Sequence, residues 1–251
     1  MQNKQKIIAM IPARMGSTRL AKKNLALLNG KPMISYAIAA ALESGVFDRV
    51  VVNSENPAFG EIAARYGAEF YQRPEKLGGS TIKADDVVYD FMANNAGHVT
   101  AWVNSTSPLQ TAEEIKMVID YFCQENLDSL ITVREEQVHC LHGGRPLNFS
   151  EEGPFTQTQD LVPVQRFVYS IMMWRNESFM ADYEKQGYAF FCGKTGYYPV
   201  SKESALIVKT KDDLKLIDFI LKGKACSRNF SVEYDSPNPE RIVGSKTNNG
   251  G

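Results

Sequence analysis

Short apolar runs alternate with stretches of helical periodicity along most of the 251-residue chain. The apolar runs, which predict buried strands, lie at residues 7–12, 49–52, 69–71, 99–103, 129–133, 169–174, 196–200 and 205–208. Apolar residues recur at helical spacing at residues 32–44, 61–66, 84–94, 111–124, 177–185 and 211–223. Strands that alternate with helices in this way form βαβ units, so we expect one large α/β domain.

The alternation stops between about residues 135 and 168, where glycines and prolines interrupt short polar and aromatic pieces. Gly143, Gly144, Gly153, Pro154 and Pro163 disfavour any long regular element there. We therefore predict an insertion that lies outside the core of a single domain covering residues 1–226. Residues 227–251 are expected to form a polar tail.

Composition narrows the classes of function. A hydrophobic content of 43% supports a packed core, and a formal net charge of −1 argues against broad binding of nucleic acid. The four cysteines include no Cys-x-x-Cys pair, which favours reduced thiols over a disulfide framework or a zinc site. No stretch has the pattern of a signal peptide or a membrane span, so we expect a cytoplasmic protein.

The first apolar run ends at Pro12 and leads into a basic loop that contains Gly16. Glycine allows a phosphate to approach the backbone closely, and Ser17 and Thr18 can donate hydroxyl hydrogen bonds. The loop's four cations fall within ten positions that hold no carboxylate: Arg14, Arg19, Lys22 and Lys23. This pattern indicates a nucleotide triphosphate site at the carboxyl edge of the sheet. A solvated basic turn is the alternative, and the spacing matches neither the P-loop nor the dinucleotide pattern.

Three separated blocks, at residues 11–20, 23–25 and 28–34, resemble in the correct order the opening of the acylneuraminate cytidylyltransferases, which make CMP-sialic acid and its relatives. The resemblance is close over about residues 7–135 and looser over 155–222. It implies a Rossmann-like nucleotide-diphospho-sugar transferase fold, with a mixed, mostly parallel sheet flanked by helices. It also implies that the inserted segment forms a small dimerisation lobe, and hence that the protein is a homodimer with composite sites.

The resemblance assigns residues to the nucleotide. Arg73 lies in a block, residues 72–77, that is similar to the family's Arg-Pro-x-x-Leu segment and is expected to bind cytidine; a surface arginine before a rigid turn is the alternative. Asn24 is expected to read cytosine, because an amide offers both a donor and an acceptor. Lys23 is expected to meet the α-phosphate and, as the second catalytic residue beside Arg14, to stabilise charge there as pyrophosphate leaves. The nucleotide-binding set is Ala13, Arg14, Gly16, Ser17, Lys23, Asn24 and Arg73.

Two further blocks of resemblance indicate which residues bind the acceptor sugar. Residues 103–111 resemble the family's Leu-Gln-Pro-Thr-Ser-Pro-Leu-Arg segment, with Asn104 in place of the glutamine that contacts sugar and nucleotide. Residues 158–164 resemble its Arg-Gln-Asp-Leu-Pro-Pro segment, with Thr158 in place of the arginine. A sugar acid needs a cation for its carboxylate, and Arg166 is the nearby candidate. The expected sugar-binding set is Asn104, Thr106, Ser107, Gln159 and Arg166.

The main departure from the family is at the residues that bind its metal ion. The family carries an Asp-x-Asp pair before the last helix that holds magnesium, and here Ile207 and Lys209 stand at those positions. Isoleucine cannot bind a hard cation, since Mg²⁺ requires oxygen ligands. Three alternatives stay open: Mg²⁺ is held by phosphates and water alone, Lys209 supplies the positive charge instead, or catalysis has been lost.

The sequence thus predicts a cytidylyltransferase that activates a nonulosonic or other deoxy-ulosonic acid with CTP and releases pyrophosphate. One alternative is a catalytically impaired relative that binds a nucleotide or sugar nucleotide. Another is a nucleotidyltransferase for a different nucleoside triphosphate, because residues 13–20 also resemble the spore-coat polysaccharide group. Two further patterns, His139 with His142 and Asp85 with Asp86, are interpreted as structural.

Overall fold

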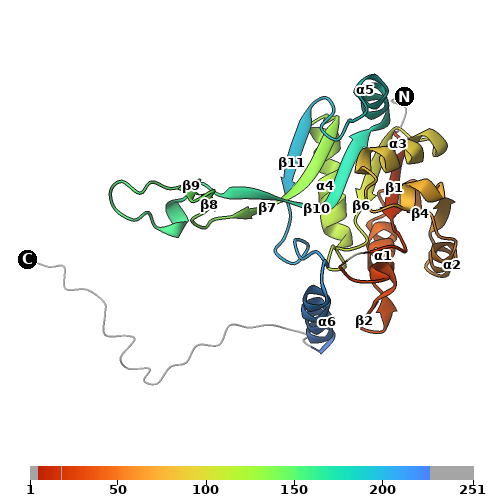
Figure 1. The fold of residues 1–251 in the computed structure, drawn as a ribbon, viewed down its shortest axis with the longest axis horizontal. Coiled ribbons are helices and arrows are strands. Elements are labelled where there is room, and N and C mark those ends of the chain that lie inside the picture. Colours follow the sequence, from red (N-terminus) through yellow and green to blue (C-terminus); the bar gives the residue numbers. More distant parts are fainter. Residues whose placement is uncertain (1–4, 18, 227–251) are drawn as a thin grey trace, which may run out of the picture.

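The computed structural model describes residues 5–17 and 19–226, which form a seven-stranded sheet with helices on both faces (Figure 1). The strands of the sheet are β1 (Ile7–Pro12), β4 (Arg49–Ser54), β5 (Glu69–Gln72), β6 (Val99–Val103), β7 (Ser129–Glu136), β10 (Val164–Arg175) and β11 (Thr195–Pro199). Their order is β11-β7-β10-β6-β1-β4-β5. Only β10 runs antiparallel to its neighbours within this sheet, so the expected mixed, mostly parallel sheet is confirmed.

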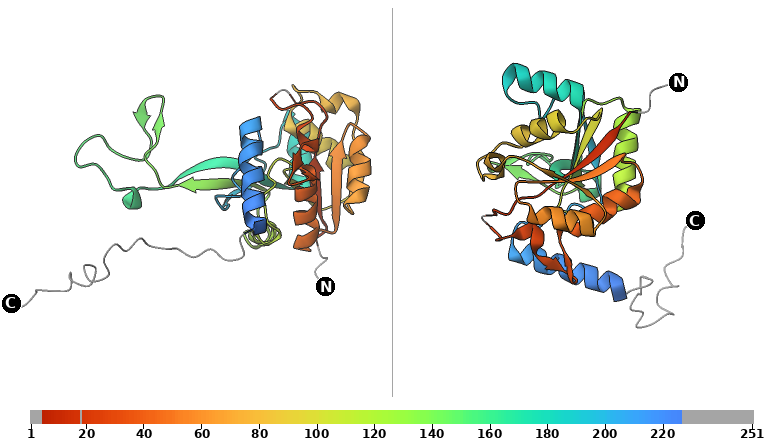
Figure 2. Two further views of the ribbon diagram at one scale, coloured as in Figure 1. Left: turned by 90° about the horizontal axis from the view of Figure 1, so that it is seen from below. Right: turned by 90° about the vertical axis from the view of Figure 1, so that its right-hand side faces the viewer.

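The described residues form six α-helices, of which α1 to α5 cover the two faces of the sheet and α6 packs beside the β2 segment (Figure 2). The six helices are α1 (Ile34–Ser44), α2 (Ala58–Arg65), α3 (Ala84–Asn94), α4 (Ala112–Gln124), α5 (Asn176–Gln186) and α6 (Lys211–Cys226). Successive side chains of a strand point to opposite faces. In β1, Ala9 and Ile11 therefore pack with α1, α2 and α4, whereas Ile8 and Met10 pack with α3 and α5. Every β1 residue from Ile8 to Ile11 is fully buried, as the continuous apolar run predicts.

The segment between β1 and α1 is shaped by one hairpin. Strand β2 (Leu27–Leu28) pairs with β3 (Lys31–Pro32) through Asn29 and Gly30, which both have positive φ, of 43° and 77°. Asn-Gly is the favoured sequence for such a two-residue turn. The hairpin places Pro32 in a strand, so α1 begins at Ile34 and not at residue 32 as the periodicity predicted. The short helix η1 (Lys23–Leu25) precedes the hairpin and carries Lys23 and Asn24 toward the sheet.

The predicted insertion is more ordered than its glycines and prolines suggest. Strands β7 and β10 continue past the sheet as a two-stranded ribbon, which Figure 1 shows projecting from the body. We call residues 135–168 the arm; its outer part holds the hairpin of β8 (Leu141–His142) and β9 (Arg145–Pro146) and the turn η3 (Thr158–Asp160). The register of β10 against β7 shifts between Phe167 and Met172, where Tyr169 has a φ of +60°. Strand β10 thus begins at Val164 and not at residue 169.

The prediction of a strand at residues 205–208 is wrong. This segment is irregular chain leading to α6 and pairs with no strand of the described sheet. Its alternating pattern has another cause: Leu206 and Val208 pack with Leu28 and Ile217 in one apolar cluster, whereas Ala205 and Ile207 pack in a second one. A segment whose side chains alternate between two apolar clusters shows the same period as a strand.

The polar tail predicted at residues 227–251 lies outside the described residues. Within the described part of the chain, none of the helices combines the length and the hydropathy that crossing a membrane requires.

Candidate active site

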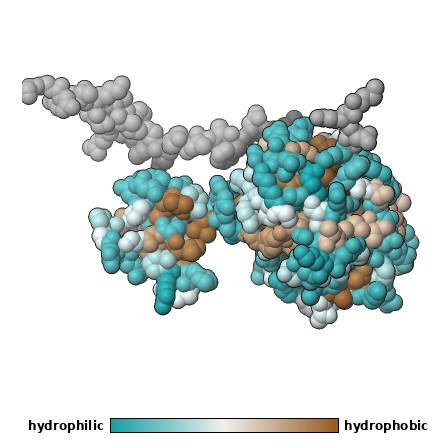
Figure 3. All heavy atoms as spheres, turned by 90° about the horizontal axis from the view of Figure 1, so that it is seen from above, coloured by the Kyte–Doolittle hydropathy of each residue, from teal (hydrophilic) through white to brown (hydrophobic). Residues whose placement is uncertain are grey.

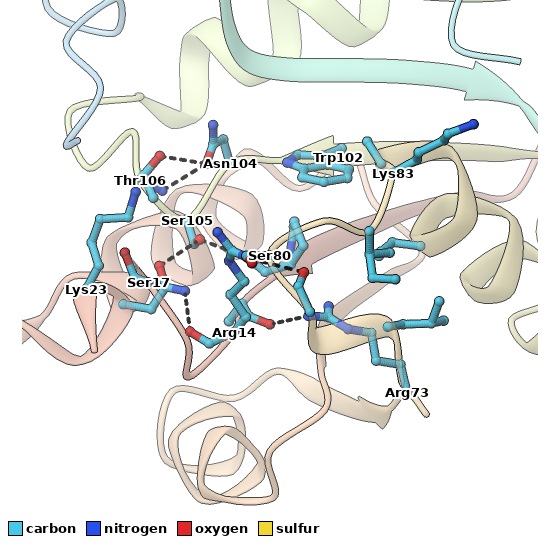
Figure 4. Close-up of a pocket in the computed structure, with 18 residues that line it drawn as sticks. Arg14, Ser17, Lys23, Arg73, Ser80, Lys83, Trp102, Asn104, Ser105 and Thr106 are labelled. Atoms are coloured by element: carbon cyan, nitrogen blue, oxygen red, sulfur yellow. Dashed lines mark hydrogen bonds between the residues drawn. The ribbon is translucent and has the colours of Figure 1, made fainter. Parts of the chain in front are cut away.

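A pocket of about 330 Å³ opens at the carboxyl ends of β1 and β6, where open α/β sheets bind their ligands (Figure 4). Its walls are the loop after β1, the turn after β6 and the segment that leads into α3. Eight of the expected site residues line it: Ala13, Arg14, Ser17, Lys23, Asn24, Arg73, Asn104 and Thr106. The other described residues that line it include two more polar ones on the α3 side, Ser80 and Lys83, but no aspartate or glutamate.

The two expected catalytic residues tie the loop after β1 to distant segments. Arg14 Nη1 donates to the carbonyl oxygen of Gly79 at 3.3 Å, and Lys23 Nζ donates to that of Val208 at 3.0 Å. Burial, reinforced by the nearby charges of Arg19 and Arg14, lowers the pKa of the Lys23 ammonium below its usual 10.5. The positive charges of these residues repel one another. An anion bound among them reduces this repulsion, so anion binding is favourable here.

Asn24 is buried, and its amide is engaged within the protein. The Ser105 hydroxyl lies 3.1 Å from Asn24 Oδ1 and 2.8 Å from the carbonyl oxygen of Pro12. Asn24 Nδ2 is at the outer limit of hydrogen bonding, 3.5 Å from the carbonyl oxygen of Arg14. Ser105, which the sequence reasoning missed, therefore joins the turn after β6 to the loop after β1. A serine among several in a strand-end turn gave no signal that distinguished it.

Arg73 is an internal brace, with only 3% of its side chain exposed. Its guanidinium donates to the carbonyl oxygens of Ala13 and Asn53, both at 2.9 Å, and forms a 2.8 Å ion pair with Glu55. Burial lowers the pKa of Arg73, and the charge of Glu55 opposes that shift. Glu55 in turn accepts a 2.8 Å hydrogen bond from the backbone of Met15. This network fixes the loop after β1 to the ends of β4 and β5.

Asn104 connects the pocket to the base of the arm. Its Oδ1 accepts hydrogen bonds from the backbone nitrogen and the hydroxyl of Thr106, at 3.0 and 2.9 Å. Its Nδ2 donates to the carbonyl oxygen of Tyr169 at 3.0 Å. The side chain thus shapes the turn after β6 and holds it against β10 at the register shift.

Four expected site residues lie off this pocket, and their roles stay predictions. A Cβ added at Gly16 would meet open space. Ser107 is buried behind the pocket, and its hydroxyl has no partner within the described chain. Gln159 and Arg166 lie on the arm, where Gln159 Nε2 donates to Gln157 and Arg166 pairs with Glu136 at 3.1 Å.

The donors around the pocket do not fit a magnesium ion held by the protein. The described chain holds no group of three or more His, Cys, Asp or Glu residues that could bind a metal. Ile207 packs in an apolar cluster, and the backbone nitrogen of Lys209 donates to Asp213 at 2.8 Å. Asp213 also accepts from the backbone and the hydroxyl of Thr210, at 2.8 and 2.9 Å, so its carboxylate is occupied at the start of α6.

Trp102 and Lys83 also line the pocket, and no motif in the sequence singles them out. The indole nitrogen of Trp102 is buried and has no hydrogen-bond partner within the described residues. A buried donor left unpaired costs about 1–3 kcal/mol. The sequence hides this feature, because a tryptophan in the run 99–103 looks like one more apolar residue of a buried strand.

The sequence of this chain is similar to those of known cytidylyltransferases. A family model described as cytidylyltransferase matches residues 8–208. An N-acylneuraminate cytidylyltransferase of Streptococcus agalactiae serotype V is 31% identical over 219 residues, which cover 83% of this chain and 51% of the relative. The chain thus spans about half the length of that relative. Post-translational flagellin modification protein B of Campylobacter coli is 26% identical over 87% of this chain and 96% of its own length.

Solved structures support the fold. A CMP:2-keto-3-deoxy-manno-octonic acid synthetase, solved as a complex with CTP, superposes with a TM-score of 0.68 at 16% identity, covering 87% of this chain and 99% of the other. A 4-diphosphocytidyl-2C-methyl-D-erythritol synthase from Anaerococcus prevotii gives a TM-score of 0.64 at 13% identity, over 88% and 100% of the two chains. The Rossmann-like fold is therefore confirmed. Together with the family match, these comparisons bear out the resemblance seen in the sequence, and the chain belongs to the cytidylyltransferase family.

Proposed function

We propose that this protein transfers CMP from CTP to a hydroxyl group of a nonulosonic or other deoxy-ulosonic acid and releases pyrophosphate. The observation that carries the proposal is the charge of the pocket: Arg14, Lys23 and Lys83 line it, and no described lining residue is acidic. Both proposed substrates are anions, so such a pocket attracts each of them. The relatives named N-acylneuraminate and pseudaminic acid cytidylyltransferases support this class of acceptor.

In the proposed reaction, the acceptor's hydroxyl oxygen bonds to the α-phosphorus of CTP. The bond from that phosphorus to the oxygen bridging to the β-phosphorus breaks, and pyrophosphate leaves with the electron pair. The hydroxyl proton passes to water, because no histidine, aspartate or glutamate is among the described lining residues. Negative charge develops on the nonbridging oxygens of the α-phosphate, and we assign its stabilisation to Arg14 and Lys23.

We further propose that cationic side chains neutralise the triphosphate where the related enzymes carry carboxylates. Lys209 lies close enough to Lys23 for its charge to contribute to the lowered pKa of that lysine. Lys209 therefore adds to the same positive potential as Arg14 and Lys23. No step of the proposed reaction uses a metal ion held by the protein, because the donor set described above does not fit one.

The direct test is pyrophosphate release from CTP with sialic, legionaminic, pseudaminic and ketodeoxyoctonic acids, with and without added magnesium. We expect release with one of these acids and none with CTP alone. Binding of CTP without release across the panel would favour the alternative of a nucleotide-binding protein.

A thermal-shift comparison of CTP with UTP, GTP and ATP tests whether the enzyme uses a nucleoside triphosphate other than CTP. A nucleotide that binds selectively and is present at a hundredfold excess over its Kd stabilises the protein by about 2.7 kcal/mol.

We also propose that the arm packs on a second copy of the chain. Five large apolar side chains on the arm are between 47% and 77% exposed: Val138, Leu141, Leu147, Phe155 and Val162. Figure 3 shows apolar residues gathered on this outlying lobe. Exposed apolar patches of this kind mark interaction surfaces.

Sedimentation velocity should accordingly give about twice the 28.0 kDa mass of one chain. Replacing Leu141, on the exposed β8 hairpin, by aspartate is expected to shift the population toward monomer. The same change at Leu216 on α6, which is also exposed, serves as the matched control. A wild-type protein that sediments as a monomer at micromolar concentration would contradict the proposal.

A further inference from the structure

Lys23, assigned above to the α-phosphate, lies in a segment that cannot hold its own conformation. Helix η1 is a single turn of three residues, and no side chain caps its start. A helix this short makes too few hydrogen bonds to persist alone. The residue before it, Lys22, has a φ of 49°, a left-handed backbone conformation that residues other than glycine disfavour. Contacts with other parts of the fold must therefore hold η1 in place.

Ser105 makes the contact that holds η1 from the side of the sheet. Its hydroxyl oxygen lies 3.1 Å from Oδ1 of Asn24, the middle residue of η1, and 2.8 Å from the carbonyl oxygen of Pro12, the last residue of β1. Ser105 and Asn24 are both buried, and hydrogen bonds are stronger in such a region of low dielectric. One hydroxyl thus ties η1 to the turn after β6 and to the end of β1.

This contact is part of a closed ring that runs through the Lys23 ammonium. Lys23 Nζ donates to the carbonyl oxygen of Val208 at 3.0 Å, and the backbone nitrogen of Val208 donates to the carbonyl oxygen of Thr106 at 2.9 Å. Thr106 follows Ser105 in the chain. Because Lys23 precedes Asn24, the contact between Asn24 and Ser105 closes the ring. Figure 4 shows the Lys23 side chain extending toward Thr106, and two hydrogen bonds that meet at Ser105.

The two supports of Lys23 differ in what they leave free for a nucleotide. The carbonyl oxygen of Val208 holds the ammonium itself and so competes with a phosphate oxygen for it. The support from Ser105 acts through the neighbouring residue, Asn24, and does not touch the ammonium. Of the two, the Ser105 support can therefore fix Lys23 without weakening its contact with phosphate.

We propose that Ser105 is a positioning residue for Lys23: its hydroxyl fixes η1 and so keeps the ammonium directed at the α-phosphate during the transfer. This inference rests on the proposed function, in which Lys23 stabilises the charge that develops on the α-phosphate. A preorganised charge needs no rearrangement as the reaction proceeds, and a small displacement of such a group lowers the rate strongly. Ser105 should therefore affect kcat only while Lys23 is present.

The test is a double-variant cycle on kcat. Ser105→Ala should lower kcat about tenfold, with the KM for both substrates and the Kd for CTP changed by less than about twofold. In the Lys23→Met background, the same change should lower kcat by less than about twofold, because no ammonium is left to position.

Ser129→Ala is the matched control. Ser129 is fully buried, and its hydroxyl also has two partners far away in the sequence: the carbonyl oxygen of Cys192 at 2.9 Å and the hydroxyl of Thr195 at 2.8 Å. It does not line the pocket, so the variant should keep kcat within about twofold of wild type although it loses comparable contacts.

Two kinetic results would overturn the inference. One is an equal loss of kcat from Ser105→Ala with and without Lys23, which is the mark of a merely structural role. The other is a weakened Kd for CTP at an unchanged kcat, which would make Ser105 and Asn24 part of nucleotide recognition instead.

Hydrogen exchange separates this inference from the proposed function, because it requires no activity. The backbone nitrogens of Leu25 and Ala26 make the hydrogen bonds of η1, at 2.8 and 3.1 Å. Ser105→Ala should speed the exchange of these two amide hydrogens at least about fivefold, whereas Ser129→Ala should not. Faster exchange in a protein that releases no pyrophosphate refutes the proposed function alone, and unchanged exchange refutes the inference.

Discussion

Replacing Arg73 by methionine should lower the free energy of unfolding by about 3–5 kcal/mol, the usual cost of removing one partner of a buried ion pair. The side chains of Arg73 and Glu55 are only 3% and 12% exposed, so the variant leaves a carboxylate buried without its counter-charge. It also leaves the carbonyl oxygens of Ala13 and Asn53 without their donor. Urea unfolding monitored by circular dichroism measures this loss.

Arg49 offers a matched control. It pairs with Glu69 at 2.6 Å, but the two side chains are 27% and 52% exposed, so Arg49→Met should cost no more than about 1 kcal/mol. Changing both Arg73 and Glu55, to methionine and leucine, should recover part of the stability lost in the single variant. If Arg73→Met instead proves as mild as Arg49→Met and chiefly weakens CTP binding, then Arg73 is the cytidine ligand that the sequence predicted and not a brace.

Replacing Lys23 by methionine should lower kcat by about 10²–10³-fold, the effect expected when one preorganised charge that stabilises a transition state is removed. Stability should change little, because among the described residues the Lys23 ammonium makes one hydrogen bond, to the carbonyl oxygen of Val208. The adjacent Lys22→Met is the control, since Lys22 does not line the pocket. A kcat within threefold of wild type in Lys23→Met would remove this residue from the catalytic set.

The pKa of Lys23 adds a signature in pH. Because burial and the neighbouring arginines lower it below 10.5, the ammonium loses its proton at a lower pH than an ordinary lysine does. The cationic fraction, and with it kcat, should therefore fall as pH rises toward that lowered pKa. Lys23→Arg keeps the charge throughout this range, so its alkaline loss should shift to higher pH. A pH profile between 7 and 10 for both proteins shows whether the shift occurs.

The sequence predicts those parts of the fold in which one face or both faces of an element are apolar. The buried run of β1 and the helical spacing of α3 and α4 mark these elements because burial determines their residue types. The arm could not be predicted in the same way. Beyond the sheet, the residues of its ribbon are half-buried in β7 and mostly exposed in β10, so they carry no clear period. Residues 205–208 are the opposite case: their sequence has the alternating pattern of a strand, but they pair with no strand of the described sheet.

For the site, the sequence located the loop and the turn that carry the polar residues but not the direction in which each side chain points. Asn24, Arg73 and Asn104 all reach the pocket wall, yet each is bonded to other parts of the protein. A motif cannot distinguish a residue that contacts a ligand from one that holds the residue doing so. Trp102 was missed for a related reason, because its unpaired nitrogen is a property of its surroundings and not of its residue type.

The position of β10 also affects how the chain is made. This strand lies between β6 and β7, although it is synthesised after both of them. While the ribosome adds the residues between Val103 and Arg175, which takes on the order of ten seconds at ordinary elongation rates, β6 has an unpaired edge in the middle of the future sheet. That edge belongs to a strand rich in apolar residues, so the nascent chain passes through a period in which chaperones or neighbouring chains can bind it before its own partner strand exists.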